Sequence, residues 1–214
     1  MELDTETAIK AALLTLTVSI FLIIYNLPKK ALSNLRTNNR TSIQSNRHFL
    51  NGAHLLSRSR STRNKATSSA LAKDALSEAD KALLLKPRDA AAHILRGLAL
   101  DQLGHRAAAL KALDAALAPP VVKSLSAREK GDALVKRAEI MIGVNKRRRV
   151  DSALEDLVEA VELTRDNCKA FCLLGQCYEF KGMVDEAVGA YNQALVLDPA
   201  SALARDGLDR FKSS

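Results

Sequence analysis

The sequence of 214 residues predicts an all-α protein, in which a single N-terminal transmembrane helix precedes an α-solenoid of about four helix–turn–helix repeats and a C-terminal capping helix. Three observations favour this fold class. Aromatic residues make up 4% of the chain and Trp is absent, which suits closely packed helices better than a sheet. Residues 8–27 form an apolar stretch with a single charge. Residues 168–199 hold two short amphipathic helical patterns separated by a glycine.

The stretch 168–199 contains one complete repeat unit. Apolar residues recur at helical spacing on both sides of Gly182, and Asp198-Pro199 ends the second pattern. Small and large apolar residues alternate as in two antiparallel helices that approach closely. They are Phe171, Leu174, Gly175, Tyr178, Ala187, Tyr191, Ala194 and Leu195. This set resembles the tetratricopeptide repeat, a unit of about 34 residues, so the chain is identified as a small membrane-anchored member of that family.

Weaker copies of the unit precede it in the chain. We expect repeats at 45–89, 90–123, 124–167 and 168–201, with a capping helix and tail at 200–214. Gly52 and Gly97 occupy equivalent places 45 residues apart, eleven more than the repeat length of about 34. The first repeat is therefore expected to carry an insertion between its helices, at 57–65. The third is expected to have a long turn at 143–150, followed by a capping box of Ser152 and Glu155.

The N-terminal part is predicted to comprise an acidic tail at 1–7, a membrane anchor at 8–28 and a basic polar linker or short helix at 29–44. Ala11–Pro28 are uncharged and, at 1.5 Å per residue, match a bilayer core of about 30 Å. We expect Ala8 to Leu27 to contact the lipid. A cleaved signal peptide is disfavoured, because the chain begins with acidic residues and has no small-residue cleavage site after the apolar stretch. A buried helix of a soluble domain is disfavoured, because the stretch has no polar face.

The net charge of +8 is concentrated near the N-terminus. No Asp or Glu occurs between Glu6 and Asp74, whereas eleven Lys and Arg do. A basic flank directly after an apolar segment predicts that the repeats face the cytosol, and three clustered cysteines agree with a reducing compartment. Such an anchor resembles those of organelle outer-membrane proteins. We therefore expect a single-pass protein of a mitochondrial or plastid outer membrane, with the endoplasmic reticulum as the alternative.

No catalytic motif is present, so we expect that the chain is not an enzyme and needs no cofactor. The four histidines have no evident chemical partner. Cys168, Cys172 and Cys177 share one predicted helix, which cannot supply a fourth metal ligand, so no metal site is expected. An apolar filling role is favoured for Cys177.

Two basic runs, at 57–65 and 146–149, are interpreted mainly as solvated turns between helices. Neither has aromatic residues nearby for base stacking, so no nucleic-acid partner is expected. A secondary contact with anionic lipid is expected for the residues nearest the anchor: Lys29, Lys30, Arg58 and Arg60.

The family resemblance implies a groove lined by the first helix of each repeat, in which a protein or peptide ligand binds. The implied groove residues are Leu95, Leu98, Gln102, Val135, Lys136, Glu139, Lys169, Cys172, Gln176 and Glu179. The carboxylate clamp of chaperone-binding members is disfavoured, because only Lys136 fits its pattern. The resemblance implies a membrane-anchored adaptor that presents this groove on the cytosolic face. The alternative is a structural subunit of a larger membrane complex, such as import or assembly machinery.

Overall fold

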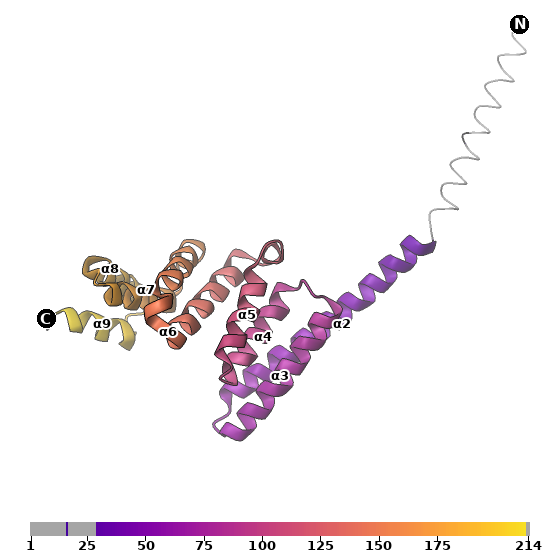
Figure 1. Cartoon of the computed structure of the whole chain (residues 1–214), viewed down its shortest axis with the longest axis horizontal. Helices are drawn as coiled ribbons and strands as arrows, with labels where there is room; N and C mark the ends of the chain where they lie inside the picture. The colour runs from indigo at the N-terminus through magenta and orange to yellow at the C-terminus, as the bar shows by residue number, and fades with distance from the viewer. Residues whose placement is uncertain (1–15, 17–28, 213–214) are drawn as a thin grey trace, which may run out of the picture. The chain divides into compact units, whose positions relative to one another are not determined.

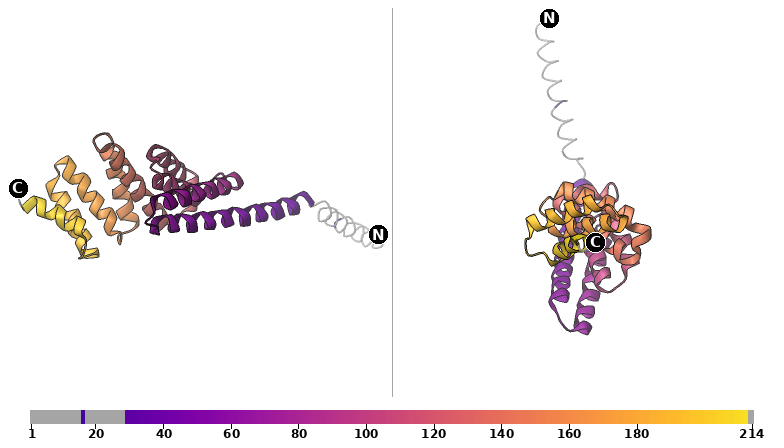
Figure 2. Two further views of the ribbon diagram at one scale, coloured as in Figure 1. Left: turned by 90° about the horizontal axis from the view of Figure 1, so that it is seen from below. Right: turned by 90° about the vertical axis from the view of Figure 1, so that its left-hand side faces the viewer.

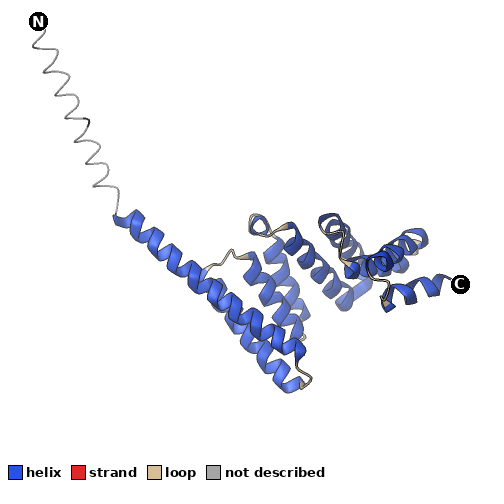
Figure 3. Cartoon of the chain, turned by 180° about the vertical axis from the view of Figure 1, so that it is seen from behind, coloured by secondary structure: helices blue, strands red, loops and turns tan. Residues whose placement is uncertain are grey.

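The computed structural model describes residues 16 and 29–212 of the chain, with side chains at Leu16 and from Arg40 onward. Every regular element among these residues is helical, and no strand occurs among them (Figure 3). The elements are α2 (Lys29–Ser61), α3 (Lys65–Leu85), α4 (Ala90–Gln102), α5 (Arg106–Leu117), the 3-10 helix η1 (Val121–Ser124), α6 (Ala127–Leu163), α7 (Cys168–Lys181), α8 (Val184–Leu197) and α9 (Ala202–Lys212). The predicted all-α fold is confirmed.

The chain divides into two units, Met1–Gln44 and Ser45–Ser214. In the first, the predicted tail and anchor lie outside the described residues, apart from Leu16. No helix in the described part of the chain has the length and apolar character needed to cross a membrane. Residues 29–44, predicted as a linker or a short helix, form the first part of α2.

The second unit consists of helix pairs that follow one another along the chain, with α9 at the C-terminal end (Figures 1 and 2). Hydrogen bonds between the Ser45 hydroxyl and the Ala82 carbonyl, and between Ser59 and Ser68, join α2 to α3. From α3 onward each α-helix packs against the next. The pairs are α2/α3, α4/α5, the two halves of α6, and α7/α8, and they pack as tetratricopeptide-like helical pairs.

Side-chain caps and glycines set the ends of these helices. Asn64, Asp89, Ser126 and Asn167 each accept backbone N–H hydrogen bonds at the first turn of α3, α4, α6 and α7, respectively. At Ser126 the cap is a complete capping box with Glu129. Gly182 ends α7 with a φ of 76°, a left-handed conformation that favours glycine.

The structure corrects the predicted insertion in the first repeat. Residues 57–61 continue α2 and Lys65 begins α3, so only residues 62–64 form the turn. The extra residues therefore lengthen the two helices rather than the loop between them, which leaves few backbone groups without intrahelical partners.

The predicted long turn at 143–150 is also wrong. The two helices of the third repeat meet at one non-helical residue, Asn145, with φ −157° and ψ 89°. The Asn145 side chain accepts a hydrogen bond from the Arg148 backbone N–H at 3.2 Å and so caps the second half of α6. Ser152 and Glu155 lie inside that helix, so the predicted capping box is wrong as well.

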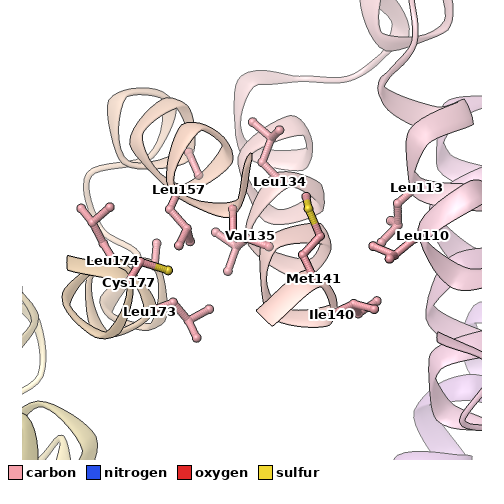
Figure 4. Packing of buried hydrophobic residues seen from close by; sticks show 14 of the residues in the cluster. Leu110, Leu113, Leu134, Val135, Ile140, Met141, Leu157, Leu173, Leu174 and Cys177 are labelled. Atoms are coloured by element: carbon pink, nitrogen blue, oxygen red, sulfur yellow. The ribbon is translucent and has the colours of Figure 1, made fainter. Parts of the chain in front are cut away.

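The core of the second unit is built mainly from alanine and leucine. Its largest cluster joins α4 to α8 and includes Leu134, Met141 and Leu157 of α6, which lie between the leucines of α5 and those of α7 (Figure 4). Smaller clusters lie between α2, α3 and α4 and between α7, α8 and α9. The residues of all three clusters lie between Phe49 and Phe211, so the second unit contains a complete core of its own.

Candidate functional site: the groove of the first helices

A groove with a volume of about 730 Å³ lies on the second unit. Its lining comes almost entirely from the first helix of successive pairs: α2, α4, the first half of α6 and the start of α7. Because side chains three or four positions apart share a helix face, α2, α4 and the first half of α6 each present a row of residues to the groove. On α4 this row includes Ala91, Ile94, Leu98 and Gln102.

The part of the groove formed by α2 and α4 is largely apolar. Phe49, Ala53 and Leu56 line it from α2, and Ile94, Leu95 and Leu98 line it from α4. Leu56 and Leu95 are buried against the small cluster beneath, whereas Phe49, Ile94 and Leu98 are half-buried. Half-buried apolar side chains in a groove gain further burial when a ligand covers them.

Four charged residues form a chain of ion pairs across the groove. The Lys136 ammonium lies 2.7 Å from Asp101 and 3.0 Å from Glu139, and Lys169 donates to Glu139 at 2.8 Å. These contacts connect α4, α6 and α7, which belong to three successive pairs. We call this set the ion-pair chain, and it fixes the charged side of the groove in one arrangement.

The ion-pair chain changes the pKa values of its members. Burial lowers the pKa of Lys136, but hydrogen bonds with Asp101 and Glu139 outweigh it, so this pKa lies above its ordinary value. Burial raises the pKa of Glu139, but hydrogen bonds from Lys169 and Lys136 outweigh it and leave that pKa below its ordinary value. Both groups are therefore charged near neutral pH.

Seven of the ten residues that the resemblance implied line this groove. They are Leu95, Leu98, Gln102, Val135, Lys136, Glu139 and Lys169. Lys136, the one residue that fitted a carboxylate clamp, already has two acidic partners.

The other three, Cys172, Gln176 and Glu179, do not line the groove. Cys172 is buried in the cluster shared with α8 and α9, and its Sγ lies 3.5 Å from the Ser201 Oγ. Glu179 accepts hydrogen bonds from the Tyr191 hydroxyl at 2.8 Å and from Arg210 at 2.7 Å. The groove therefore ends at the start of α7, and beyond that point α8, α9 and Ser201 contact Glu179 and Cys172.

Several lining residues were missed at the sequence level. Phe49, Arg60, Ile94, Asp101 and Asp132 line the groove beside the predicted positions. Ile94 and Asp101 lie four before and three after Leu98, so the helical period around that residue was the signal that could have found them. Arg60 was assigned to a turn, and its place became evident only once α2 was seen to continue to Ser61.

Cys172 and Cys177 are buried and provide no reactive thiol. Burial raises the pKa of the Cys177 thiol to about 11, and burial also raises that of Cys172, so both thiols are protonated at neutral pH. Within the described part of the chain, no group of three or more His, Cys, Asp or Glu side chains is placed to hold a metal ion.

Comparison with known proteins supports the repeat assignment. The family described as Tetratricopeptide repeat matches residues 168–201. The crystal structure of MamA aligns at a TM-score of 0.52 with 25% identity, over 70% of this chain and 79% of that one. The crystal structure of YrrB, titled a TPR protein with an unusual peptide-binding site, aligns at a TM-score of 0.53 with 27% identity, over 64% of this chain and 66% of that one. No curated protein matches the sequence significantly.

A third structure, the Cut9–Hcn1 hetero-tetramer of APC/C, aligns at a TM-score of 0.58 over 68% of this chain and 28% of the other. At 15% identity this likeness concerns the fold alone. The tetratricopeptide repeat matched at 168–201 and the likeness of the helix pairs to MamA and to the TPR protein YrrB indicate a scaffold rather than an enzyme.

Proposed function

We propose that this tetratricopeptide-repeat scaffold is a membrane-anchored adaptor whose groove binds a peptide segment of another protein. The observation that carries the proposal is the groove itself, which combines half-buried apolar side chains on α2 and α4 with fixed charges on α6. A peptide with apolar side chains toward α2 and α4 suits this arrangement, because it would cover Phe49, Ile94 and Leu98 while leaving the ion-pair chain intact.

The proposed anchor is Ala8 to Leu27, which the sequence supports by its length and by the Lys and Arg residues that follow it. The repeats would then lie in the cytosol at a mitochondrial or plastid outer membrane, or at the endoplasmic reticulum. A fluorescent fusion at Ser214 with protease digestion of intact organelles tests both assignments. Protection of the fusion from protease would contradict the cytosolic orientation.

The groove function is tested by filling the groove without removing a core residue. Ser57 is exposed on α2 and lines the groove, so Ser57→Trp places a large side chain within it. Ser77, exposed on α3 outside the groove lining, provides the matched control Ser77→Trp. In complexes isolated from detergent extracts, we expect a partner that is retained by the wild type and by Ser77→Trp and lost by Ser57→Trp. Equal retention by both variants would contradict groove binding.

The alternative is a structural subunit whose groove is permanently filled within a larger membrane complex. Such a subunit would be found only in a high-mass complex on native gels. An adaptor that exchanges its ligand gives, in addition, a free form whose amount falls when partner is added. If the amount of the free form does not fall when partner is added, the adaptor function is excluded.

A further inference from the structure

The turns inside the four repeats lie next to one another along one edge of the second unit, which we call the turn edge. It comprises residues 58–68, 102–106, 143–151 and 180–186. Gln102 donates to the Ser68 hydroxyl at 3.2 Å, Arg106 donates to the Gly143 carbonyl at 2.9 Å, and the Lys146 ammonium lies 4.8 Å from the centre of the Phe180 ring. Each contact joins the turn of one repeat to that of the next.

This arrangement brings together two basic runs that are far apart in the sequence. The basic residues of the turn edge are Arg58, Arg60, Arg63, Lys65, Arg106, Lys146, Arg147, Arg148, Arg149 and Lys181. Its acidic residues are Asp151, which pairs with Lys181, and Asp185 and Glu186 at the start of α8. The turn edge therefore carries a large excess of positive charge.

Most of these cations are available to a partner. Arg58, Arg63 and Lys65 from the first turn are exposed, and so are the three arginines at 147–149. Among the described residues, no ion pair or hydrogen bond engages the guanidinium or ammonium group of any of these six; Arg58 and Arg148 make hydrogen bonds through their backbone only. The loops that connect one repeat to the next lack this excess of free positive charge. There Arg128 pairs with Asp166, and acidic and basic residues are mixed.

Exposed apolar side chains accompany the cations. Val144, Phe180 and Val184 are 45%, 43% and 49% exposed, and all three lie at the turns of the third and fourth repeats. Long cationic side chains around short apolar ones are typical of surfaces that rest on a bilayer, where the cations meet anionic headgroups and the apolar groups enter the interface.

We propose that the turn edge is a second binding surface, which shares only Arg60 and Gln102 with the groove, and that it binds the anionic headgroups of a membrane. Nucleic acid is less well suited, because Phe180 is the single aromatic residue of this edge and Lys146 lies over one face of its ring, whereas base stacking along a strand uses several free rings. An acidic protein would account for the arginines but not for the exposed valines beside them. A lipid surface accounts for both.

The test uses residues 40–214, which contain the whole core of the second unit, so that the N-terminal apolar segment does not dominate binding. Sedimentation with phosphatidylcholine vesicles, with and without phosphatidylserine, measures partitioning at about 0.15 M salt. In the edge variant, Arg58, Arg63, Arg147, Arg148 and Arg149 become Gln. The matched control changes five exposed basic residues away from the edge to Gln: Lys73, Arg88, Lys111, Lys123 and Arg165.

We expect binding that requires phosphatidylserine, falls at least about tenfold in the edge variant and is nearly unchanged in the control. The double variant Val144→Ser with Val184→Ser should bind more weakly than wild type. Ser57→Trp should bind vesicles normally, which separates this surface from the groove. Equal losses in the edge and control variants would overturn the proposal, because net charge alone would then explain binding. Tighter binding to a single-stranded oligonucleotide or to polyglutamate than to vesicles would also overturn it.

Discussion

Lys136 on α6 and Asp101 on α4 form an ion pair of 2.7 Å across the groove, and both side chains are about three-quarters buried. This contact joins the second and third repeats, and Glu139 and Lys169 extend it to the fourth. The same charges that face a ligand therefore also hold adjacent repeats together. Changes in the ion-pair chain should affect the stability of the unit as well as binding.

Replacing Lys136 should destabilise the second unit. Lys136→Ala leaves the mostly buried carboxylates of Asp101 and Glu139 without their shared cation, at an expected cost of about 1–2 kcal/mol in the free energy of unfolding. Lys111→Ala, at an exposed site, should stay within about 0.5 kcal/mol of wild type. Urea unfolding followed by circular dichroism measures both. Equal stabilities of the two variants would contradict the bridging role.

The stabilising contribution of Glu139 should disappear in acid. Its pKa in the folded protein lies below the ordinary value, so the group stabilises the fold above its unfolded pKa. That stabilisation is lost as the pH falls through the folded pKa. Glu139→Gln should therefore be less stable than wild type at about pH 7 and close to it at about pH 3. A difference that stays constant across this range would show that the charge of Glu139 is not responsible.

Tyr191 requires glycine at position 175. A Cβ at Gly175 would lie 2.7 Å from the buried Tyr191 ring, so Gly175→Ala should cost about 1–3 kcal/mol through overpacking. Gly189 is also helical but has open space around its Cβ position, so Gly189→Ala should stabilise the protein by about 0.5–1 kcal/mol. Thermal unfolding of the two variants compares them directly. Destabilisation by both would indicate that helix context, not the ring, decides the result.

The capping helix should protect Cys172. α9 contributes Ala204, Leu208 and Phe211 to the cluster that contains the buried Cys172. A chain that ends at Ala200 should expose this thiol and react with a maleimide at least about tenfold faster at position 172. Peptide mapping separates Cys172 from Cys177, whose labelling should change little because it belongs to the central cluster. Unchanged labelling of Cys172 would contradict the covering role of α9.

The helix pairs could be predicted because the repeat signal in 168–199 is strong and local. Helix periodicity cannot say whether extra residues extend a helix or a loop, so Arg60 and Asn145 were both misplaced. The predicted residues on α4 and α6, and Lys169 on α7, line one groove. The repeat pattern alone does not reveal that, farther along α7, Glu179 bonds to Arg210 and Cys172 to Ser201.

The sequence also could not predict that the four turns form one continuous edge. The contact between Arg106 and Gly143 joins residues 37 positions apart, and no local pattern predicts that the two basic runs share one edge. Stacking of the repeats brings them together.

Site-specific photo-crosslinking is the most direct test of the groove as the partner-binding site. A benzophenone side chain would replace Ser57 or Asp132 in the groove, and Leu84 or Lys111 at exposed sites outside its lining. We predict that one polypeptide is crosslinked in cells from both groove positions and from neither outer position. Crosslinking of the same polypeptide with equal yield from Leu84 would contradict the account.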